Sequence, residues 1–195
     1  ALSRHNGLLL KPYGFHTDSY YYLFKNTPVL SAYKNTLIYM VSGTAINLIM
    51  TTLAAYLLSR KYIYWKKYIM VMIVITMFFS GGLIPKYLMI RSFGWINTIW
   101  PLIIPGAINS WNLMIMRTYF MGMPGNLEES AKIDGAGDLL VLAKIIIPLA
   151  MPVMAVMTLF YAVGHWNSWF SASIYLHDRD KFPLQLFLRE LLIAT

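Results

Sequence analysis

Four long uncharged runs limit what this chain can fold into. No Asp, Glu, Lys or Arg occurs within residues 35–59, 68–85, 92–116 or 145–177. A helix needs about 20 mainly apolar residues to cross the hydrocarbon core of a bilayer, so each run reaches or approaches that length. Because lipid offers no partners to backbone N–H and C=O groups, such runs favour helices that satisfy those groups internally. The sequence therefore predicts an all-α, polytopic transmembrane helical bundle.

The composition agrees with a membrane protein. Only 12% of the residues are charged, against roughly 25% in an average soluble domain. The chain has no cysteine, which excludes disulfides, thiolate metal sites and cysteine nucleophiles within it. The net charge of +8 is scattered between the apolar runs, which favours contact with lipid headgroups over nucleic acid. We expect membrane lipid as a partner and no nucleic acid.

We expect a single transmembrane domain over residues 1–195, with spans at about 35–58, 68–90, 97–117 and 148–167. Residues 1–34 mix charged and aromatic side chains and are expected to lie at the membrane surface. Residues 59–67 carry four basic side chains and no acid, which predicts that this loop is cytoplasmic and that the first span runs inward. The chain starts without methionine and ends in an apolar run, so we expect a piece of a longer protein.

Small residues and helix breakers lie inside the first two spans. Gly43, Asn47, Thr51 and Ala55 recur every four positions and so share one helix face. This face allows close packing of another helix or lines a substrate path. In the second span the segment 80–85 holds two glycines and a proline, which weaken a helix. Either a helix end at the surface or a transport pathway explains that segment.

The hydrophilic segment 118–147 is expected to form two short helices around a turn. Asn126 can cap the first helix, and Glu128 and Glu129 lie in its first turn, where carboxylates suit the helix dipole. Gly135 can take the left-handed conformation that ends a helix, and Asp138 can cap the second helix. The apolar face of that second helix is formed by Leu139, Leu142, Ile145 and Ile146.

Motifs of enzymes and ion-coupled carriers are missing from this sequence. It contains no His-Glu-x-x-His, no phosphate-binding glycine loop and no Gly-x-Ser-x-Gly elbow. The four histidines stand apart, so we expect neither a metal site nor catalytic residues. No acidic residue lies within an expected span, which argues against an intramembrane proton relay.

The 118–147 segment resembles a known motif. Glu129-Ser130-Ala131, then Asp134-Gly135-Ala136, Pro148 and Pro152 resemble the Glu-Ala-Ala loop of permease subunits of bacterial binding-protein-dependent ABC importers. Ser130, Leu142 and Ile147 replace the usual alanine, phenylalanine and leucine, all at packing positions that tolerate a change of size. Further segments, including 78–85, 116–120 and 164–169, look like the maltose-type carbohydrate importers, in the branch associated with oligosaccharides from complex polysaccharides.

This resemblance implies a type I ABC importer permease-like fold with a cytoplasmic helix-turn-helix coupling loop. Family members have six spans, so the chain would lack the first and the last. The implied partners are a second permease subunit in a heterodimer, cytoplasmic ATPase subunits that use ATP and Mg²⁺, and an extracellular solute-binding protein. The chain itself would bind no cofactor and catalyse no reaction, and it would lie in the bacterial plasma (inner) membrane. The implied ATPase-coupling residues are Glu128, Glu129, Ala131, Asp134, Gly135, Ala136, Leu142 and Pro148.

Polar and aromatic side chains in the later spans are candidates for a substrate pathway. They are Asn109, Asn112, His165, Trp166, Asn167 and Trp169. Asn109 and Asn112 lie three residues apart, so we expect them to share one helix face. They would be costly to expose to lipid, so that face contacts either a neighbouring helix or a cavity. The aromatic and amide groups of 165–169 suit a sugar, and they equally suit an aromatic belt at the interface. An importer of peptides or an anion remains an alternative function, as does a membrane enzyme or a non-transport scaffold.

Overall fold

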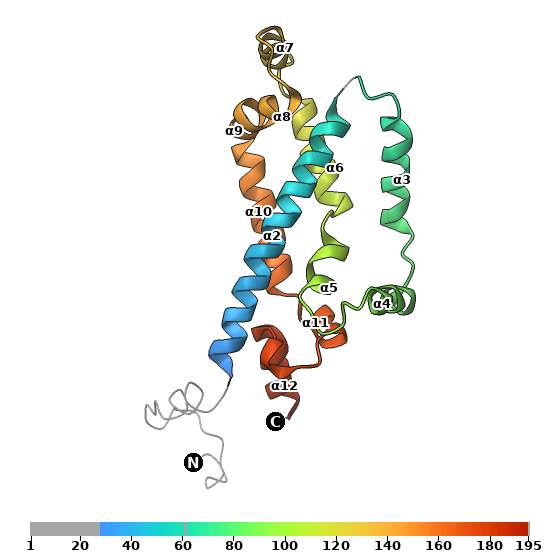
Figure 1. Cartoon of the computed structure of the whole chain (residues 1–195), viewed down its shortest axis with the longest axis vertical. Helices are drawn as coiled ribbons and strands as arrows, with labels where there is room; N and C mark the ends of the chain where they lie inside the picture. Colours follow the sequence, from blue (N-terminus) through green and yellow to red (C-terminus); the bar gives the residue numbers. More distant parts are fainter. Residues whose placement is uncertain (1–27, 61, 195) are drawn as a thin grey trace, which may run out of the picture.

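The computed structural model describes residues 28–60 and 62–194 (Figure 1). All regular structure in this part of the chain is helical, which confirms the all-α prediction. Residues 1–27 of the predicted surface segment, 1–34, lie outside the described residues. From Val29 onward the chain is already helical.

The helices in chain order are α2 (Val29–Ser59), α3 (Lys66–Phe78), α4 (Leu83–Ser92), α5 (Trp100–Ile103), α6 (Ser110–Met121), α7 (Asn126–Ile133), α8 (Asp138–Val141), α9 (Ile147–Leu149), α10 (Met151–Trp166), α11 (Trp169–Tyr175) and α12 (Leu184–Ala194). Short helical segments of other pitch join some of them: η2 (Ile104–Gly106), η3 (Leu142–Ile146) and η4 (Arg179–Lys181).

Helix α2 is the centre of the bundle. It packs along α10 and α6, and Figure 1 shows these three helices side by side. Its buried face carries the small-residue stripe of Gly43, Asn47, Thr51 and Ala55. The Thr51 hydroxyl lies 2.7 Å from the hydroxyl of Tyr161 on α10. A Cβ on Gly43 would lie 2.5 Å from Cε1 of His165, so the imidazole packs directly against this glycine. These contacts confirm the packing interpretation of the stripe.

Only α2 is long and apolar enough to cross a bilayer as one straight helix within the described residues. The expected second span, 68–90, is not one helix, because α3 and α4 meet at 114°. Gly82 between them has φ +82°, a conformation that breaks a helix and favours glycine. The segment Asp138–Leu149 and α10 meet at 86° across Ala150. Counting each bent pair as one span gives up to three, and the membrane boundaries of the four expected spans remain a prediction.

The expected third span, 97–117, is also interrupted. Helix α5 ends at Ile103, the short η2 follows, and α6 begins only at Ser110. Pro105 lies in η2, where it lacks the backbone N–H that a continuous helix would use. Helices α3 and α4 lie to one side of the bundle in Figure 1, where α3 packs against α6, and Ile90 is the one buried residue described in them.

An apolar cluster fills the bundle where the 118–147 segment joins it, which we call the loop end. Tyr56 of α2, Met116 of α6, Val141 of α8 and Met157 of α10 meet there, and each is at most 2% exposed. The base of the segment is thereby packed against the three central helices.

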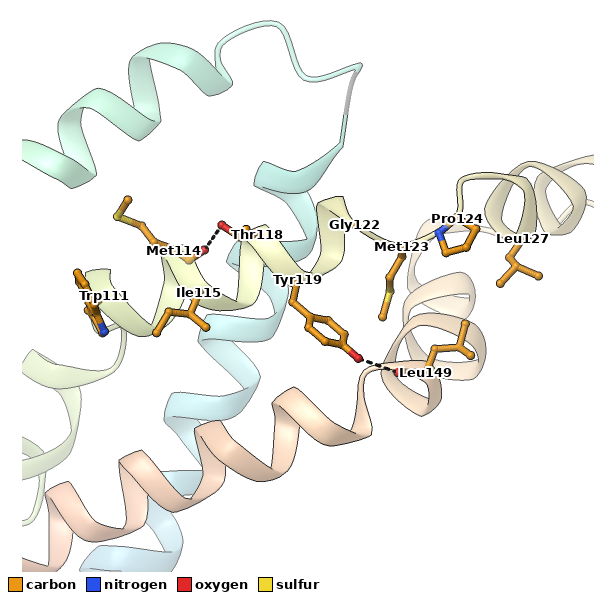
Figure 2. A pocket seen from close by; sticks show the side chains of 10 residues that line it. All are labelled: Trp111, Met114, Ile115, Thr118, Tyr119, Gly122, Met123, Pro124, Leu127 and Leu149. Carbon is orange, nitrogen blue, oxygen red and sulfur yellow. Dashed lines mark hydrogen bonds between the residues drawn. The ribbon is translucent and has the colours of Figure 1, made fainter.

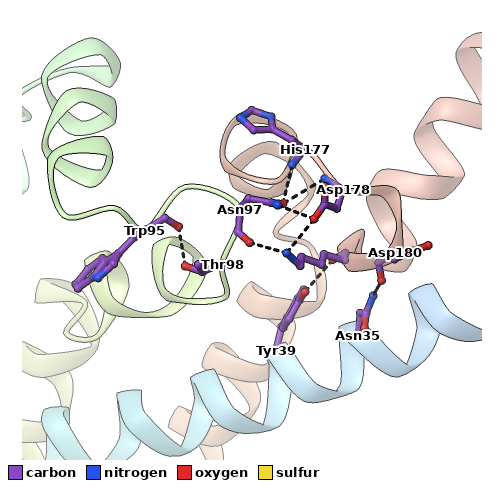
Figure 3. A network of polar contacts seen from close by, with 9 residues as sticks. Asn35, Tyr39, Trp95, Asn97, Thr98, His177, Asp178 and Asp180 are labelled. Atoms are coloured by element: carbon purple, nitrogen blue, oxygen red, sulfur yellow. Dashed lines mark hydrogen bonds and ion pairs between the residues drawn. The ribbon is translucent and has the colours of Figure 1, made fainter.

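A polar network ties together the opposite end of the bundle (Figure 3). Asn97 adopts φ +62°, and its Oδ1 accepts hydrogen bonds from the backbone N–H groups of His177 and Asp178, at 3.2 Å each. Its Nδ2 donates to Asp178 Oδ2 at 2.6 Å, and Lys181 Nζ donates to both Asn97 O and Asp178 Oδ2 at 3.0 Å. The hydrogen bonds from Asn97 and Lys181 hold the pKa of Asp178 below its ordinary value. The network joins the segment before α5 to the segment before α12.

Candidate functional site

The segment 118–147 forms the expected helix–turn–helix and projects from the loop end (Figure 1). Its first helix, α7, begins one residue earlier than it would if Asn126 were the N-cap. Gly125 is the N-cap, and Asn126 is the first helical residue, so the predicted capping role of Asn126 is wrong. Glu128 and Glu129 do lie in the first turn, as expected. Their carboxylates therefore stand near the positive end of the helix dipole.

Gly135 ends α7 in the left-handed conformation, with φ +81°, as the sequence predicts. The Gly135 N–H donates to Lys132 O at 3.0 Å, and the Ala136 N–H donates to Ala131 O at 2.9 Å. This pair of bonds is the Schellman arrangement, which satisfies the last carbonyls of a helix. No atom lies within 4 Å of a Cβ built on Gly135, so its conformation, and not crowding, demands glycine there.

The second helix departs from the prediction in two ways. Its N-cap is Gly137, and Asp138 is the first helical residue without a capping bond, so the predicted cap is wrong. Leu142 and Ile146 are buried as expected, but Leu139 is 72% exposed and Val141 is fully buried instead. The wider π turn of η3 breaks the 3.6-residue period that had placed Leu139 on the buried face.

Opposite charges hold α7 to the bundle. Glu128, 8% exposed, forms an ion pair with Arg60 at the end of α2. Lys132 Nζ lies 3.2 Å from Glu128 Oε1 and 3.1 Å from Asp138 Oδ1. Tyr62 donates a hydrogen bond of 3.3 Å to Asp138 Oδ2. The hydrogen bond from Lys132, supported by those charges and Tyr62, holds the pKa of Asp138 below its ordinary value.

The eight predicted coupling residues divide between two faces. Four belong to the inner face: Glu128 is buried, Leu142 is buried in the loop-end cluster, and Ala131 and Ala136 pack against it. The other four are exposed: Glu129, Asp134, Gly135 and Pro148. Exposed Ile133 (86%) and Leu139 (72%) accompany them. Sequence reasoning missed Arg60, Tyr62 and Lys132, although the four-residue spacing of Glu128 and Lys132 was a usable signal.

The two asparagines proposed for a pathway have different surroundings. Asn109 lies before α6 in extended backbone and is exposed. Its Oδ1 accepts from the Asn112 N–H at 3.1 Å, so its side chain caps α6. Asn112 is 8% exposed within α6. The expectation that both share one helix face is wrong, because Asn109 is not in the helix.

The remaining pathway candidates are not brought into one site. His165 faces Gly43, its Nε2 is buried, and no hydrogen bond reaches that atom in the described residues. Trp166 makes an edge contact with Tyr33, with ring centroids 6.1 Å apart. Asn167 is exposed and donates to Val163 O, whereas Trp169 lies under the Arg189 guanidinium at 3.6 Å. A substrate role for these residues stays a prediction.

A groove of about 880 Å³ runs along α6 towards the loop (Figure 2). Its walls include Trp111, Met114, Tyr119, Leu127 and Leu149. Tyr119 spans it and donates a 3.5 Å hydrogen bond to Leu149 O. No charged or amide side chain lines the groove, and its polar side-chain groups are those of Trp111, Thr118 and Tyr119.

Residues 27–187 match the family described as binding-protein-dependent transport system inner membrane component. The chain is 41% identical over 187 residues to the polygalacturonan/rhamnogalacturonan transport system permease protein YtcP of Bacillus subtilis (strain 168), covering 96% of this chain and 65% of that protein. It is 28% identical over 179 residues to the maltodextrin transport system permease protein MdxG of the same organism, covering 88% of this chain and 63% of that protein.

A solved structure has the same fold. It is the crystal structure of a bacterial ABC transporter involved in the import of the acidic polysaccharide alginate, with a TM-score of 0.92 and 34% identity. The match covers all of this chain and 69% of that one. The chain thus spans about two thirds of the length of the proteins that it matches.

Proposed function

Since the chain belongs to the family of binding-protein-dependent transport system inner membrane components, we propose that it is a permease subunit of an ATP-driven importer of oligosaccharides. The observation that carries this proposal is the projecting helix–turn–helix of α7 and α8. Its inner face is fixed to the bundle, and its outer face leaves an acidic and apolar surface free. Such a surface suits docking into a groove of another protein.

The docking partner that we propose is a cytoplasmic ATPase subunit. Glu129 and Asp134 would make polar contacts, Gly135 gives the turn its shape, and Ile133 and Leu139 supply apolar area. ATP and Mg²⁺ would be bound and used by that partner. A second permease subunit and an external solute-binding protein complete the proposed importer in the bacterial membrane. The exposed apolar faces of α3 and α4 fit contact with lipid or with that second subunit.

The carbohydrate class of the cargo is supported by the names of the relatives. The Bacillus subtilis proteins are named for polygalacturonan/rhamnogalacturonan and for maltodextrin, and the solved transporter for alginate. We propose that the cargo is an oligosaccharide derived from a polysaccharide. An importer of peptides or of an anion is the alternative outcome of the test below.

The test is uptake by the complete importer in proteoliposomes. The full-length chain, its companion permease and the ATPase are reconstituted, and the solute-binding protein is supplied with labelled galacturonan fragments, alginate fragments, maltodextrins or peptides. The expected result is uptake of an oligosaccharide that requires both ATP and the binding protein. Uptake of peptides alone, or uptake independent of ATP, would contradict the proposal.

A variant tests the docking surface separately. Gly135→Trp should prevent the ATPase from copurifying with the permease while the permease still inserts into the membrane. Gly94→Trp is the matched control, because Gly94 also has positive φ and no atom within 4 Å of its Cβ position. It follows the end of α4, and Figure 1 shows α4 at the opposite end of the structure from α7. Equal ATPase recovery with both variants would rule out the proposed docking role of the loop.

A further inference from the structure

Helix α7 is held to the bundle chiefly by charge. Of the residues in α7, Glu128 is the buried one. Its partner, Arg60, is the C-cap of α2, so the ion pair joins α7 to the very end of that helix. Both side chains are almost fully enclosed, at 12% exposed for Arg60 and 11% for Glu128. An enclosed pair is screened far less by salt than a surface pair, so it can hold two segments firmly together.

Arg60 is itself fixed in place. Its backbone N–H donates to Leu57 O at 3.2 Å, and its guanidinium lies 4.1 Å from the centre of the Tyr56 ring. Lys66 Nζ donates to Arg60 O at 3.0 Å, and Arg117 Nε of α6 donates to Leu58 O at 3.0 Å. The cationic partner of Glu128, the Arg60 guanidinium, is therefore held at the end of α2 by several contacts.

A second layer joins the two arms of the helix–turn–helix. Lys132 lies between the carboxylates of Glu128 and Asp138 and 4.7 Å from the centre of the Tyr62 ring. The charges alternate in sign from Arg60 through Glu128 and Lys132 to Asp138. Tyr62, which follows α2 in the sequence, donates a hydrogen bond to Asp138 at the end of this row of charges. A displacement of α7 would consequently carry α8 and the end of α2 with it.

The far end of α2 is pinned as well. Asn35 Nδ2 donates to Asp180 O at 2.6 Å, and Tyr39 donates to Lys181 O at 2.8 Å, as Figure 3 shows. The Leu184 N–H donates to Thr36 Oγ1 at 2.8 Å. Helix α2 is continuous over 31 residues, which makes it about 46 Å long. One unbroken helix thus connects α7 with the 180–184 segment at the opposite end.

We propose that Arg60 is the positioning residue through which movement of the α7–α8 loop turns or shifts α2, and that α2 carries this movement to the 180–184 segment. The proposal rests on the proposed function, because it assumes that an ATPase moves the loop. Its physical basis is that α2 is held at both ends by directional contacts, whereas the other long helical units are bent in the middle.

The experiment compares variants of the complete importer in proteoliposomes, measuring uptake and ATP hydrolysis together. The variants are Arg60→Gln and Glu128→Gln, and Lys67→Gln is the matched control, a nearby basic residue in the first turn of α3 whose side chain is exposed. We expect Arg60→Gln to lower the uptake per ATP hydrolysed by roughly 5- to 150-fold, the usual range of coupling between two sites. Lys67→Gln should keep the wild-type ratio.

A covalent link between positions 60 and 128 tests whether uptake per ATP is lost because movement no longer passes from the loop to α2, and not because the variant protein is less stable. In the double variant Arg60→Cys, Glu128→Cys, a bifunctional thiol reagent should restore the uptake per ATP that the unlinked double variant has lost. An unchanged ratio in Arg60→Gln, or no recovery on linking despite normal assembly, would overturn the proposal. Absence of ATP-dependent uptake by the wild type would instead be a failure of the proposed function, so the two failures are distinguishable.

Discussion

Replacing Gly43 by alanine should destabilise the protein, although alanine is the better helix former. Gly43 lies in the middle of α2, and a Cβ there would lie 2.5 Å from Cε1 and 2.8 Å from Cδ2 of the His165 ring. Real Cβ atoms do not approach other heavy atoms so closely, so either α10 or the imidazole has to move. The imidazole is buried, which leaves it little room to turn away.

Two opposing effects set the size of the change. Alanine gains about 1 kcal/mol over glycine inside a helix. Overpacking a filled interior costs about 1–3 kcal/mol, and here the ring itself blocks the new methyl group, which places the cost at the upper end. We expect a net loss of about 1–2 kcal/mol. For a chain of this size, each kcal/mol corresponds to a fall in Tm of roughly 2–4 °C.

A double-mutant cycle measured by thermal unfolding of the full-length protein in detergent tests this reasoning. In a His165→Ala background the obstacle is gone, so Gly43→Ala should become stabilising by about 1 kcal/mol. Gly164→Ala is the control, since Gly164 lies next to His165 in α10 with no atom within 4 Å of its Cβ position. It should be neutral or stabilising. Gly43→Ala that stabilises the wild type, or loses stability equally without the imidazole, would refute the proposed packing.

Three further predictions concern the loop and the opposite end. Gly135→Ala should weaken the α7–α8 turn by about 1–2 kcal/mol because of its φ of +81°. Gly137→Ala should cost less, because alanine adopts its φ of −73° without strain and loses only the preference for glycine at an N-cap. Hydrogen exchange of the loop amides would measure both. Asn97→Gly should tolerate the positive φ but lose the side-chain hydrogen bonds to residues 177–178, so limited proteolysis should cut that segment faster. Asn97→Asp should raise the rate of cleavage further, because its carboxylate would face that of Asp178. The lowered pKa of Asp178 stabilises the folded network above its ordinary value of 3.8, so this contribution should disappear as the pH falls through the lowered value. Hydrogen exchange at 177–181 should therefore show an acid dependence that Asp178→Asn removes.

Local chemistry allowed the sequence to predict several features correctly. The uncharged run of 35–59 became α2, and the glycine at 135 took the left-handed conformation that ends α7. These features are determined by interactions among residues that are close together in the sequence. The bend beside Gly82 was partly foreseeable too, since the breaker residues were recognised, but the angle between α3 and α4 was not.

Long-range contacts could not be predicted in the same way. Nothing near Arg60 in the sequence indicates that Glu128 is its partner, because only the folding of the α7–α8 loop against the end of α2 brings them together. Leu139 was misplaced for a related reason, since the π turn that follows it changes the helical period. Asn109 was assigned to a helix face by spacing alone, and the irregular backbone after Pro105 placed it outside the helix.

Cross-linking of Ile133 most directly tests the central claim, that the outer face of the α7–α8 loop docks on the ATPase. These 195 residues hold no cysteine, so Ile133→Cys, at a position 86% exposed, adds one defined thiol to them, and any cysteine elsewhere in the full-length chain is replaced by serine. A thiol-reactive photocrosslinker attached there should link the permease to the ATPase subunit in the complete importer, and the yield should change with bound nucleotide. Phe79→Cys is the control and should give no such link, because Phe79 is 76% exposed at the end of α3 that leads to α4, and Figure 1 shows α4 at the opposite end of the structure from α7. Equal linking from both positions, or none from Ile133, would contradict the account.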